Sequence, residues 1–164
     1  MDKEKLPLRP NVCMIVFNNQ GKLFLGERAG TPGVWQFPQG GIENGASLEE
    51  NVLRELHEEL GAESSLFLIV KRLQAEHSYE FEETPAYAVG KWRGQAQQYW
   101  LVQFKGCDSD INLGRFEREL MSFKWCSIEE LRSLAEGKRL IGYEKALPEV
   151  EEYLNSQGYC KEKA

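Results

Sequence analysis

Three glutamates in the middle of the chain have a residue type and a spacing that could do chemistry. Glu55, Glu58 and Glu59 lie at positions i, i+3 and i+4, which places their side chains on one side of a helix. We expect no basic side chain to neutralise them, so these like charges would destabilise the helix without a counter-ion. Mg²⁺ and Mn²⁺ prefer carboxylate oxygens and water as ligands. The spacing therefore predicts a divalent-cation site, and the ordinary alternative is a solvated acidic helix face.

The residues around these glutamates predict the helix that must position them. Ser47 can cap its first turn, and Glu50 three residues later completes a capping box. Five apolar residues recur at helical spacing as one stripe, namely Leu48, Val52, Leu53, Leu56 and Leu60. Gly61 follows this stripe, where a left-handed residue commonly ends a helix. The loop before the helix contains Gly40, Gly41 and Gly45. Residues 40–62 are therefore predicted to form a loop, a helix and a tight turn.

The rest of the chain predicts strands and two further helices around this unit. The predicted strands cover residues 11–18, 22–27, 35–39, 65–76, 97–104 and 123–126. Helices are predicted from Ser127 to about Glu136 and from Tyr143 to Leu154. Residues 79–94 and 105–115 are predicted to be long loops. This order of elements predicts helices packed on a mixed sheet, in an α/β or α+β fold.

Length and composition predict one compact domain. The chain has 164 residues, of which 41% are hydrophobic and 28% charged, as is usual for a globular protein. We expect a single domain over residues 1–164, with residues 1–8 and 158–164 loosely ordered. No apolar run approaches the ~20 residues of a membrane helix, so no membrane partner is expected. The four cysteines have no CxxC pairing, which favours a reduced, cytoplasmic setting, and Cys13 and Cys126 are predicted to be buried thiols.

The net charge of −6 excludes one class of function. A protein that coats DNA or RNA nonspecifically is expected to be strongly basic. An enzyme that binds only one end of a nucleic acid stays possible, because the local field at its site is what matters there. The sequence does not indicate the oligomeric state.

The stretch over residues 40–62 resembles the Nudix box. That pattern reads Gly, five residues, Glu, seven residues, Arg-Glu, an aliphatic residue, any residue, Glu-Glu, any residue, Gly and an aliphatic residue. The positions that match in register are Gly40, Arg54, Glu55, Leu56, Glu58, Glu59 and Gly61. Ala46 stands where the pattern has its first Glu, and Ala62 replaces the final aliphatic residue. The resemblance implies a three-layer α/β/α sandwich with a mixed sheet and a loop-helix-loop catalytic box.

Further segments resemble one branch of the Nudix superfamily, which contains bacterial RNA 5′-pyrophosphohydrolases and the asymmetrical diadenosine tetraphosphate hydrolases of plants and bacteria. These segments are Arg9–Val12, Trp35–Gly41, Gly94–Trp100 and Asp110–Leu113, followed by Glu119. The resemblance implies a hydrolase of phosphoric anhydrides whose substrate is a nucleotide polyphosphate or the 5′ end of RNA. We favour removal of pyrophosphate from the 5′-triphosphate end of RNA, which starts RNA decay.

Two alternatives to this activity stay open. The nearer one is hydrolysis of dinucleoside polyphosphates such as diadenosine tetraphosphate, or of nucleoside triphosphates. The other belongs to a different class, because Ala46 departs from the box pattern. The chain could be a catalytically weakened Nudix module that binds nucleotides for a regulatory purpose.

The resemblance also implies which residues form the site. The expected catalytic carboxylates and metal ligands are Glu55, Glu58, Glu59 and Glu119, with Gly40 contributing to the metal site. Glu58 and Glu59 are preferred as ligands of Mg²⁺ or Mn²⁺, and Glu55 is either a ligand or a base that orients water. Arg54 is expected to orient a carboxylate, by pairing with a Glu or by holding a loop carbonyl. For Glu119 the ordinary alternative is a surface glutamate in a loop.

Eight residues are candidates for binding the substrate. They are Arg9, Arg28, Gln39, Lys91, Trp92, Arg93, Gln95 and Tyr143. Arginine suits phosphate geometry, and a cluster of basic and aromatic residues such as 91–93 can bind a 5′ end by charge and stacking. Tyr143 matches a position where the family has an aromatic residue near a base. The alternatives are unpaired surface arginines and aromatic side chains that pack on the core.

Overall fold

The computed structural model describes residues 6–159 of the chain. Its strands are β1 (Leu8–Phe17), β2 (Leu23–Arg28), β3 (Trp35–Gln36), β4 (Gln39–Gly41), β5 (Phe67–Glu80), β6 (Gly94–Phe104) and β7 (Leu120–Cys126). Its α-helices are α1 (Leu48–Leu60), α2 (Ile128–Leu134) and α3 (Gly137–Ser156). Short 3₁₀ turns lie at Ser64–Leu66, Ala86–Ala88 and Asp108–Asp110. Within the described residues, no helix is both long and apolar enough to cross a membrane.

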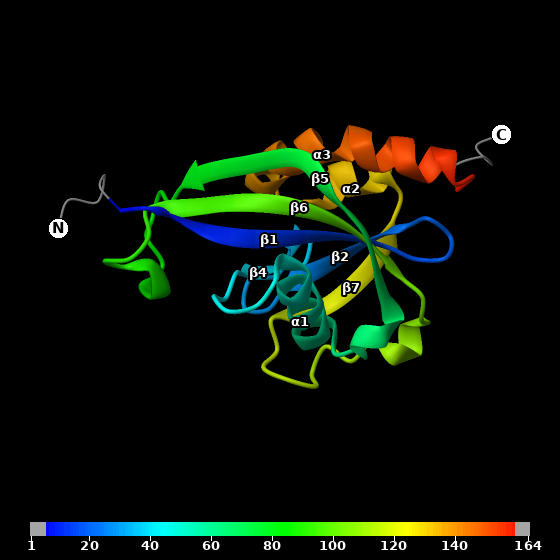
Figure 1. Ribbon diagram of the computed structural model, residues 1–164, viewed down its shortest axis with the longest axis horizontal. Coiled ribbons are helices and arrows are strands. Elements are labelled where there is room, and N and C mark those ends of the chain that lie inside the picture. Colours follow the sequence, from blue (N-terminus) through cyan, green and yellow to red (C-terminus); the bar gives the residue numbers. More distant parts are fainter. Residues whose placement is uncertain (1–5, 160–164) are drawn as a thin grey trace.

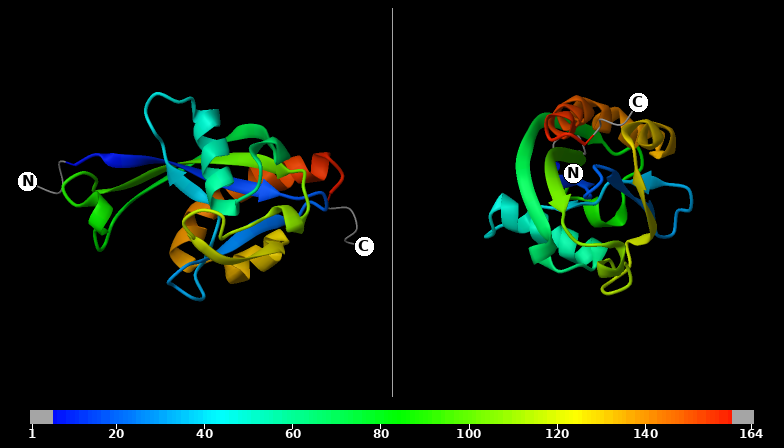
Figure 2. Two further views of the ribbon diagram at one scale, coloured as in Figure 1. Left: turned by 90° about the horizontal axis from the view of Figure 1, so that it is seen from below. Right: turned by 90° about the vertical axis from the view of Figure 1, so that its right-hand side faces the viewer.

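A seven-stranded mixed sheet forms the middle layer. The strand order is β3-β2-β1-β6-β5, with β4 also paired to β1 and β7 to β2. β1 and β6 run parallel, while β5 is antiparallel to β6 and β7 is antiparallel to β2. Figure 1 shows α2 and α3 on one side of the sheet and α1 on the other. The left view of Figure 2, taken from below, shows α1 lying across the strands. These layers confirm the expected α/β/α sandwich.

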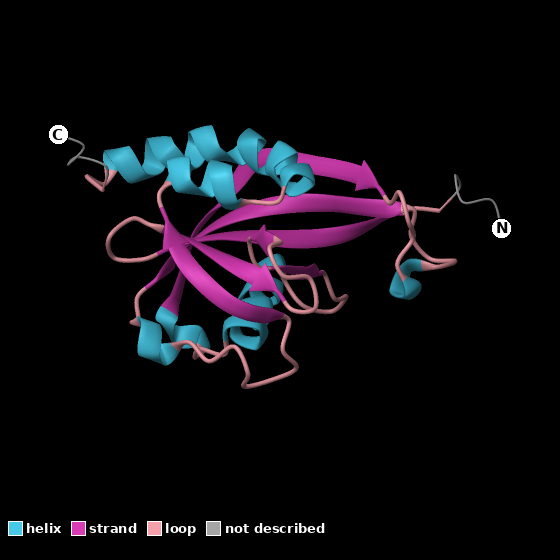
Figure 3. Ribbon diagram, turned by 180° about the vertical axis from the view of Figure 1, so that it is seen from behind, coloured by secondary structure: helices cyan, strands magenta, loops and turns pink. Residues whose placement is uncertain are grey.

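β1 explains how the two core layers are joined. Cys13, Ile15 and Phe17 belong to the apolar cluster under α2 and α3, whereas Val12, Met14 and Val16 belong to the cluster under α1. A strand that is covered on both faces needs a continuous apolar run rather than an alternating one. Figure 3 shows α2 and α3 lying along the strands on the side away from α1. The buried thiols predicted at Cys13 and Cys126 are confirmed.

The predicted elements occur with some boundaries shifted. The strand predicted over 35–39 is split into β3 and β4, because Pro38 has no N–H for the ladder. The Pro38 carbonyl instead accepts the Met14 N–H at 2.8 Å. α3 is longer at both ends than the predicted 143–154, and the Glu136 side chain caps its first turn. The loop predicted from residue 79 begins two residues later, because β5 continues to Glu80.

Parts of both ends that were predicted to be loose are ordered. β1 already begins at Leu8, and Leu6 before it is buried. Tyr159 packs the edge of its ring against Phe17, with the ring centroids 5.7 Å apart. In both places an apolar side chain covers the core, and the Gly158 N–H donates to the Asn155 carbonyl at 3.0 Å, so the prediction was wrong for residues 6–8 and 158–159. The remaining residues of those predictions, 1–5 and 160–164, lie outside the described residues.

Candidate metal and phosphate site

α1 carries the predicted glutamates, and its ends form as the sequence predicts. The Ser47 hydroxyl accepts the Glu50 N–H at 3.0 Å, and the Glu50 carboxylate accepts the Ser47 N–H at 2.7 Å. Gly61 ends the helix with a left-handed φ of 69°. The apolar stripe packs on the sheet, and Glu55 and Glu59 lie on the same buried side. Burial of this stripe therefore brings two of the three helix carboxylates against the sheet.

Glu55, Glu59 and Glu119 form the carboxylate cluster of the site. Each of them has a carboxylate oxygen within 4.8 Å of one from each of the others. Glu59 is 2% exposed and Glu55 is 9% exposed, whereas Glu119 comes from the more open loop before β7. Three oxygen donors at this separation fit a hard divalent cation. Glu58 lies outside this group and its side chain is 47% exposed, so its role as a ligand stays a prediction.

The backbone of β4 lies directly beside two of these carboxylates. The Gln39 N–H donates to a Glu59 oxygen at 3.1 Å. A Cβ atom on Gly40 would lie 2.0 Å from the carboxyl carbon of Glu55, so only glycine fits at this position without moving that carboxylate. A larger residue here would therefore have to displace the Glu55 carboxylate from its position beside β4. The contribution of Gly40 to a metal site stays a prediction.

The third carboxylate arrives through the loop that connects β6 to β7. The Asn112 N–H donates to the Leu60 carbonyl at 2.8 Å, at the last turn of α1. A Cβ on Gly61 would lie 1.9 Å from the backbone carbonyl oxygen of Asn112, so the loop and the helix end are in tight contact. Further along, the Glu119 carbonyl accepts the Ala29 N–H at 2.9 Å. These two anchors fix the loop so that Glu119 reaches the carboxylate cluster.

The carboxylate cluster resists ionisation. Burial is the main cause that raises the pKa of Glu55 to about 7, and the Arg54 guanidinium partly opposes it. Burial, followed by the charges of Glu119 and Glu55, raises the pKa of Glu59 well above its usual range. Burial and the charge of Glu117 raise the pKa of Glu119. A cation bound among these groups would remove this penalty, because it favours their charged forms.

Arg54 partly neutralises the helix carboxylates. Its Nη1 lies 2.9 Å from a Glu55 oxygen and 3.6 Å from Glu58, one turn further along α1. The expectation that no basic side chain is placed to do this is wrong, because Arg54 and Glu58 are an i, i+4 pair. Arg54 also donates to the Gly41 carbonyl at 3.3 Å. The prediction that Arg54 pairs with a glutamate or holds a loop carbonyl is therefore confirmed in both parts.

The box position that departs from the family pattern is on the surface. Ala46 is exposed in the loop before α1. The loop carboxylate that lies near Arg54 is Glu43, at 3.6 Å from Nε, and its side chain is 67% exposed. An ion pair this long and this exposed contributes little to stability. Arg54 is therefore held mainly by other partners.

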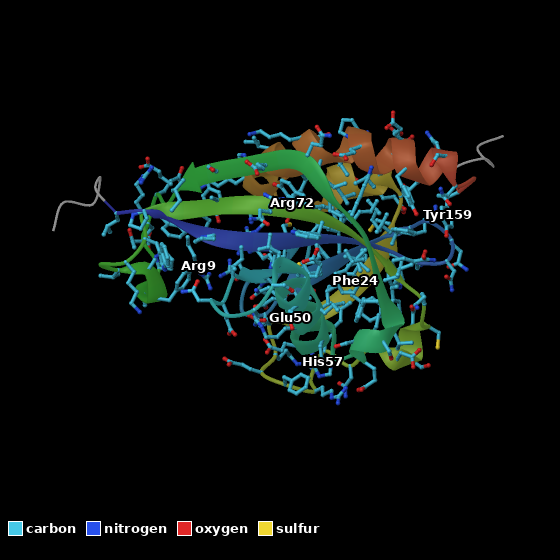
Figure 4. All side chains as sticks on the ribbon, in the orientation of Figure 1. Arg9, Phe24, Glu50, His57, Arg72 and Tyr159 are labelled. Atoms are coloured by element: carbon cyan, nitrogen blue, oxygen red, sulfur yellow. The ribbon has the colours of Figure 1, made fainter. Side chains whose placement is uncertain are left out.

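A cavity of about 250 Å³ opens beside the carboxylate cluster. Glu55, Arg9 and Trp92 all line it, together with residues 41–44 of the box loop. The Arg9 guanidinium lies over the Tyr87 ring, 4.9 Å from its centroid. Figure 4 shows Arg9 on β1, with His57 at the end of α1 that lies away from it. A cation, an aromatic ring and a carboxylate thus share one cavity, which suits a phosphate chain attached to a base.

The other predicted substrate residues have varied surroundings. The Gln39 side chain accepts a hydrogen bond from Gln97 at 2.6 Å. Gln95 is buried and donates to the Tyr79 hydroxyl at 2.7 Å, while its Oε1 has no hydrogen-bond partner among residues 6–159. Arg28 contributes a charge that lowers the pKa of Glu119, and Lys91 is exposed. Their roles in substrate binding stay predictions.

Two predicted substrate residues have contacts within the scaffold. Tyr143 is 2% exposed, its hydroxyl accepts the Phe37 N–H at 3.0 Å and its ring packs on Phe37. The prediction that it lies near a base is wrong, because α3 turns this side chain into the core. The Arg93 guanidinium donates to the Leu6 carbonyl and, at 3.3 Å, to Glu80. These bonds hold the start of the chain against β5, and a role of Arg93 in substrate binding stays a prediction.

Three buried polar side chains near the site escaped prediction. Asn11, Asn51 and Gln97 are 1%, 0% and 7% exposed. Gln97 donates to Asn11 at 3.2 Å, and Asn51 contacts the box loop and Arg54. Buried polar groups are nearly always hydrogen-bonded. A polar residue inside a predicted apolar element was the one signal that could have found them.

Comparison with known proteins agrees with this fold and with the box. The family model described as "NUDIX domain" matches residues 7–149. An RNA pyrophosphohydrolase of Sphingopyxis alaskensis is 36% identical over 140 residues, which are 82% of this chain and 87% of the relative. Nudix hydrolase 25 of Arabidopsis thaliana is 34% identical and 94% of each chain is covered. The solved structure of a C. elegans Ap4A hydrolase has a similar fold, with a TM-score of 0.63 at 17% identity over 89% of this chain and 98% of that one.

Proposed function

The chain belongs to the Nudix domain family, and from that premise we propose that it removes pyrophosphate from the 5′-triphosphate end of RNA. The observation that carries this proposal is the cluster of Glu55, Glu59 and Glu119 beside a cavity lined by Arg9 and Trp92. Relatives that are named RNA pyrophosphohydrolase support the choice of substrate. This reaction would initiate RNA decay, and the proposed setting is the cytoplasm.

The proposed cofactor is Mg²⁺, with Mn²⁺ as a substitute. Glu55, Glu59 and Glu119 would hold it, and Glu58 and the Gly40 carbonyl are further candidates. Such a cation, when bound, lowers the pKa of water and stabilises the charge of the leaving phosphate. The raised pKa values of these carboxylates support the assignment, because a cation would displace the protons that they otherwise retain.

The chain's own residues then orient the reactants. Arg54 holds the Glu55 carboxylate and the Gln39 N–H holds that of Glu59. We assign Arg9 to a substrate phosphate, because guanidinium matches phosphate geometry, and Trp92 to stacking on the first base. Water adds to one phosphorus, the anhydride bond breaks, and the products are 5′-monophosphate RNA and pyrophosphate.

A paired substrate assay tests this proposal. The purified protein is incubated with 5′-triphosphate RNA and, in parallel, with diadenosine tetraphosphate, under Mg²⁺ and under Mn²⁺. We expect release of pyrophosphate from the RNA and accumulation of 5′-monophosphate ends. The Glu59→Gln variant, purified in the same way, controls for contaminating phosphatases. If RNA ends stay intact while the dinucleotide is cleaved, the RNA assignment is wrong and the dinucleoside polyphosphate activity replaces it.

A binding module without turnover is the second candidate function, and Ala46 is the observation that favours it. This reading predicts that both substrates bind and neither is cleaved. If the protein does cleave a substrate, the Ala46→Glu variant shows whether the missing box carboxylate limits its rate. A large gain in rate would indicate a weakened enzyme, and an unchanged rate in an active protein would indicate a box that works without this carboxylate.

A further inference from the structure

Asn51 joins three parts of the site through one fully buried side chain. Its Oδ1 accepts the Glu43 N–H at 2.8 Å and an Arg54 Nη2–H at 2.7 Å. Its Nδ2 donates to the Ser47 carbonyl at 2.8 Å and to the Glu43 carbonyl at 3.4 Å. The amide thus uses two donor and two acceptor positions, and only one orientation of it can do so. Asn51 thereby connects the box loop, the first turn of α1 and Arg54.

The contact between Asn51 and Arg54 is stronger than the other loop contacts of this guanidinium. The Glu43 carboxylate lies 3.6 Å from Nε and is largely exposed to solvent, so its ion pair contributes little. The Gly41 carbonyl is 3.3 Å from Nη2. The bond to Asn51 is 2.7 Å long, lies at a buried residue and involves a charged donor, which makes it one of the stronger kinds of hydrogen bond.

Arg54 transmits this constraint to the carboxylate cluster. While Nη2 is held by Asn51, Nη1 donates to Glu55 at 2.9 Å. The two nitrogens belong to one rigid planar group. Fixing one of them therefore fixes the direction from which the other approaches Glu55. A rotation of the guanidinium away from Asn51 would leave this nearly buried carboxylate without the positive charge of Arg54.

We propose that Asn51 is a positioning residue of this site, which orients Arg54 toward Glu55 and closes the box loop over α1. The consequence for catalysis rests on the proposed function, but the orientation of Arg54 does not. Ala46 offers no carboxylate from the exposed loop, and the chain instead anchors Arg54 from a buried amide one turn before Glu55 on the same helix.

The first experiment observes the Arg54 guanidinium without metal or substrate. In the intact chain its NMR signals are expected to show slow rotation and slow hydrogen exchange, because both Nη atoms are hydrogen-bonded. Asn51→Ala should remove this protection. Asn51→Asp keeps an acceptor oxygen for Arg54 and loses the two donor bonds, so it should retain the protection. It also tests the proposal if the alanine variant does not fold.

The second experiment measures Mn²⁺ affinity by calorimetry for the same variants and for Ser47→Ala. Ser47→Ala weakens the same end of α1 by removing its cap, but it retains the carbonyl that Asn51 contacts. We expect Asn51→Ala to weaken Mn²⁺ binding about 10- to 100-fold, as loss of a group that orients a ligand does. Ser47→Ala should leave Mn²⁺ affinity unchanged.

The outcomes separate positioning from a purely structural role. Equal losses of Mn²⁺ affinity in Asn51→Ala and Ser47→Ala would mean that Asn51 only stabilises the helix. The proposal would also be overturned if the Arg54 guanidinium kept its slow rotation and slow hydrogen exchange in Asn51→Ala. Loss of that protection in Asn51→Asp would overturn it as well. RNA turnover is not a readout in either experiment, so failure of the RNA assignment leaves this test intact.

Discussion

Glu55 is placed where ionisation is unfavourable, because it is 9% exposed and lies beside Glu59 and Glu119. In the folded protein its pKa is about 7, compared with about 4.3 for an unperturbed glutamate. Between these values the folded chain binds more protons at this residue than the unfolded chain. The free energy of unfolding therefore falls as pH rises through this range. Below about pH 4 both states are protonated, and the penalty is absent.

The metal-free protein should consequently lose thermal stability between about pH 4 and about pH 7 through this group. Unfolding in the presence of a chelator measures it, and Glu55→Gln should flatten the profile. The pKa of His77 is lowered, mainly by burial, and this increases stability as pH rises. The contribution of Glu55 is therefore the difference in pH dependence of thermal stability between the intact chain and Glu55→Gln. Identical slopes for both would contradict the assignment.

Glu59 should be the most costly carboxylate to lose from the site. Glu59→Gln removes a carboxyl group that is nearly inaccessible to solvent and that the Gln39 N–H holds in place. We expect metal-dependent turnover to fall by more than the roughly 100-fold that loss of an outer-shell partner costs. The free energy of unfolding without metal should be unchanged or higher, because the folded protein no longer has to hold an ionisable carboxyl group in its less favourable environment.

Substrate turnover and urea unfolding measure these two effects. Glu49→Gln, an exposed change on the same helix, is the matched control. Turnover in Glu59→Gln equal to that of the control would exclude Glu59 as a ligand.

The sequence predicted these carboxylates better than it predicted their neighbours. The box pattern has a fixed spacing, so Glu55 and Glu59 could be assigned before their surroundings were known. Tyr143 could not be assigned in the same way, because its residue type suits both a base-binding site and a core. Only the rotation of α3 decides between the two, and in the structure it places the Tyr143 ring against Phe37 in the core.

At the scale of elements, the end of α1 is fixed from two directions. Gly61 has the left-handed φ that ends the helix, and the loop that carries Glu119 lies against it. Substituting Gly61→Ala should cost about 1–2 kcal/mol for the conformation alone, and more because its Cβ would meet the Asn112 oxygen.

Gly45→Ala is the matched control for this substitution. Gly45 also has a positive φ, of 90°, but a Cβ added there would meet no atom within 4 Å. Urea unfolding should show the larger loss for Gly61→Ala, and Mn²⁺ affinity should fall only in that variant. Equal losses would mean that the docked loop does not depend on this helix end.

Element boundaries were predictable where a local signal exists. Ser47, Glu50 and Gly61 specify both ends of α1, and all three act as predicted. The path of the loop over residues 105–119 carries no such signal. Its position depends on backbone contacts with α1 and with Ala29, which residues far apart in the sequence provide. Glu119 was therefore assigned by resemblance, and its distance from the other two carboxylates was not predictable.

At the scale of the whole molecule, the sheet separates the two apolar clusters. Leu147 in α3 belongs to the cluster away from the site, and Leu56 in α1 belongs to the cluster beneath it. Leu147→Ala and Leu56→Ala should each destabilise the protein by about 2–5 kcal/mol. Under conditions where both variants are folded, only Leu56→Ala should weaken Mn²⁺ binding, because Leu56 directly follows Glu55 on the helix. Equal weakening in both variants would show that the two layers are coupled.

The fold class was predictable, but the strand order was not. Apolar runs identify the strands, and the box resemblance implies the three layers. Neither states that β1 pairs with β6, because an apolar run covered on both faces fits any interior position of a sheet. That one connected sheet carries both apolar clusters supports our expectation of a single domain, which stays a prediction.

The parallel pairing of β1 with β6 has a consequence for the order of events in folding. Arg9 lies opposite Gln95 and Phe17 opposite Gln103, so each residue of the first strand pairs with one that is synthesised much later. Closing so long a loop delays folding, because the chain loses conformational entropy before the contacts between the two strands can compensate for it. α1 can form early from its own caps, but its carboxylates meet Glu119 only after the chain beyond β6 has left the ribosome. A nascent chain that ends before residue 104 thus contains every residue of α1 but is expected to have no cation site.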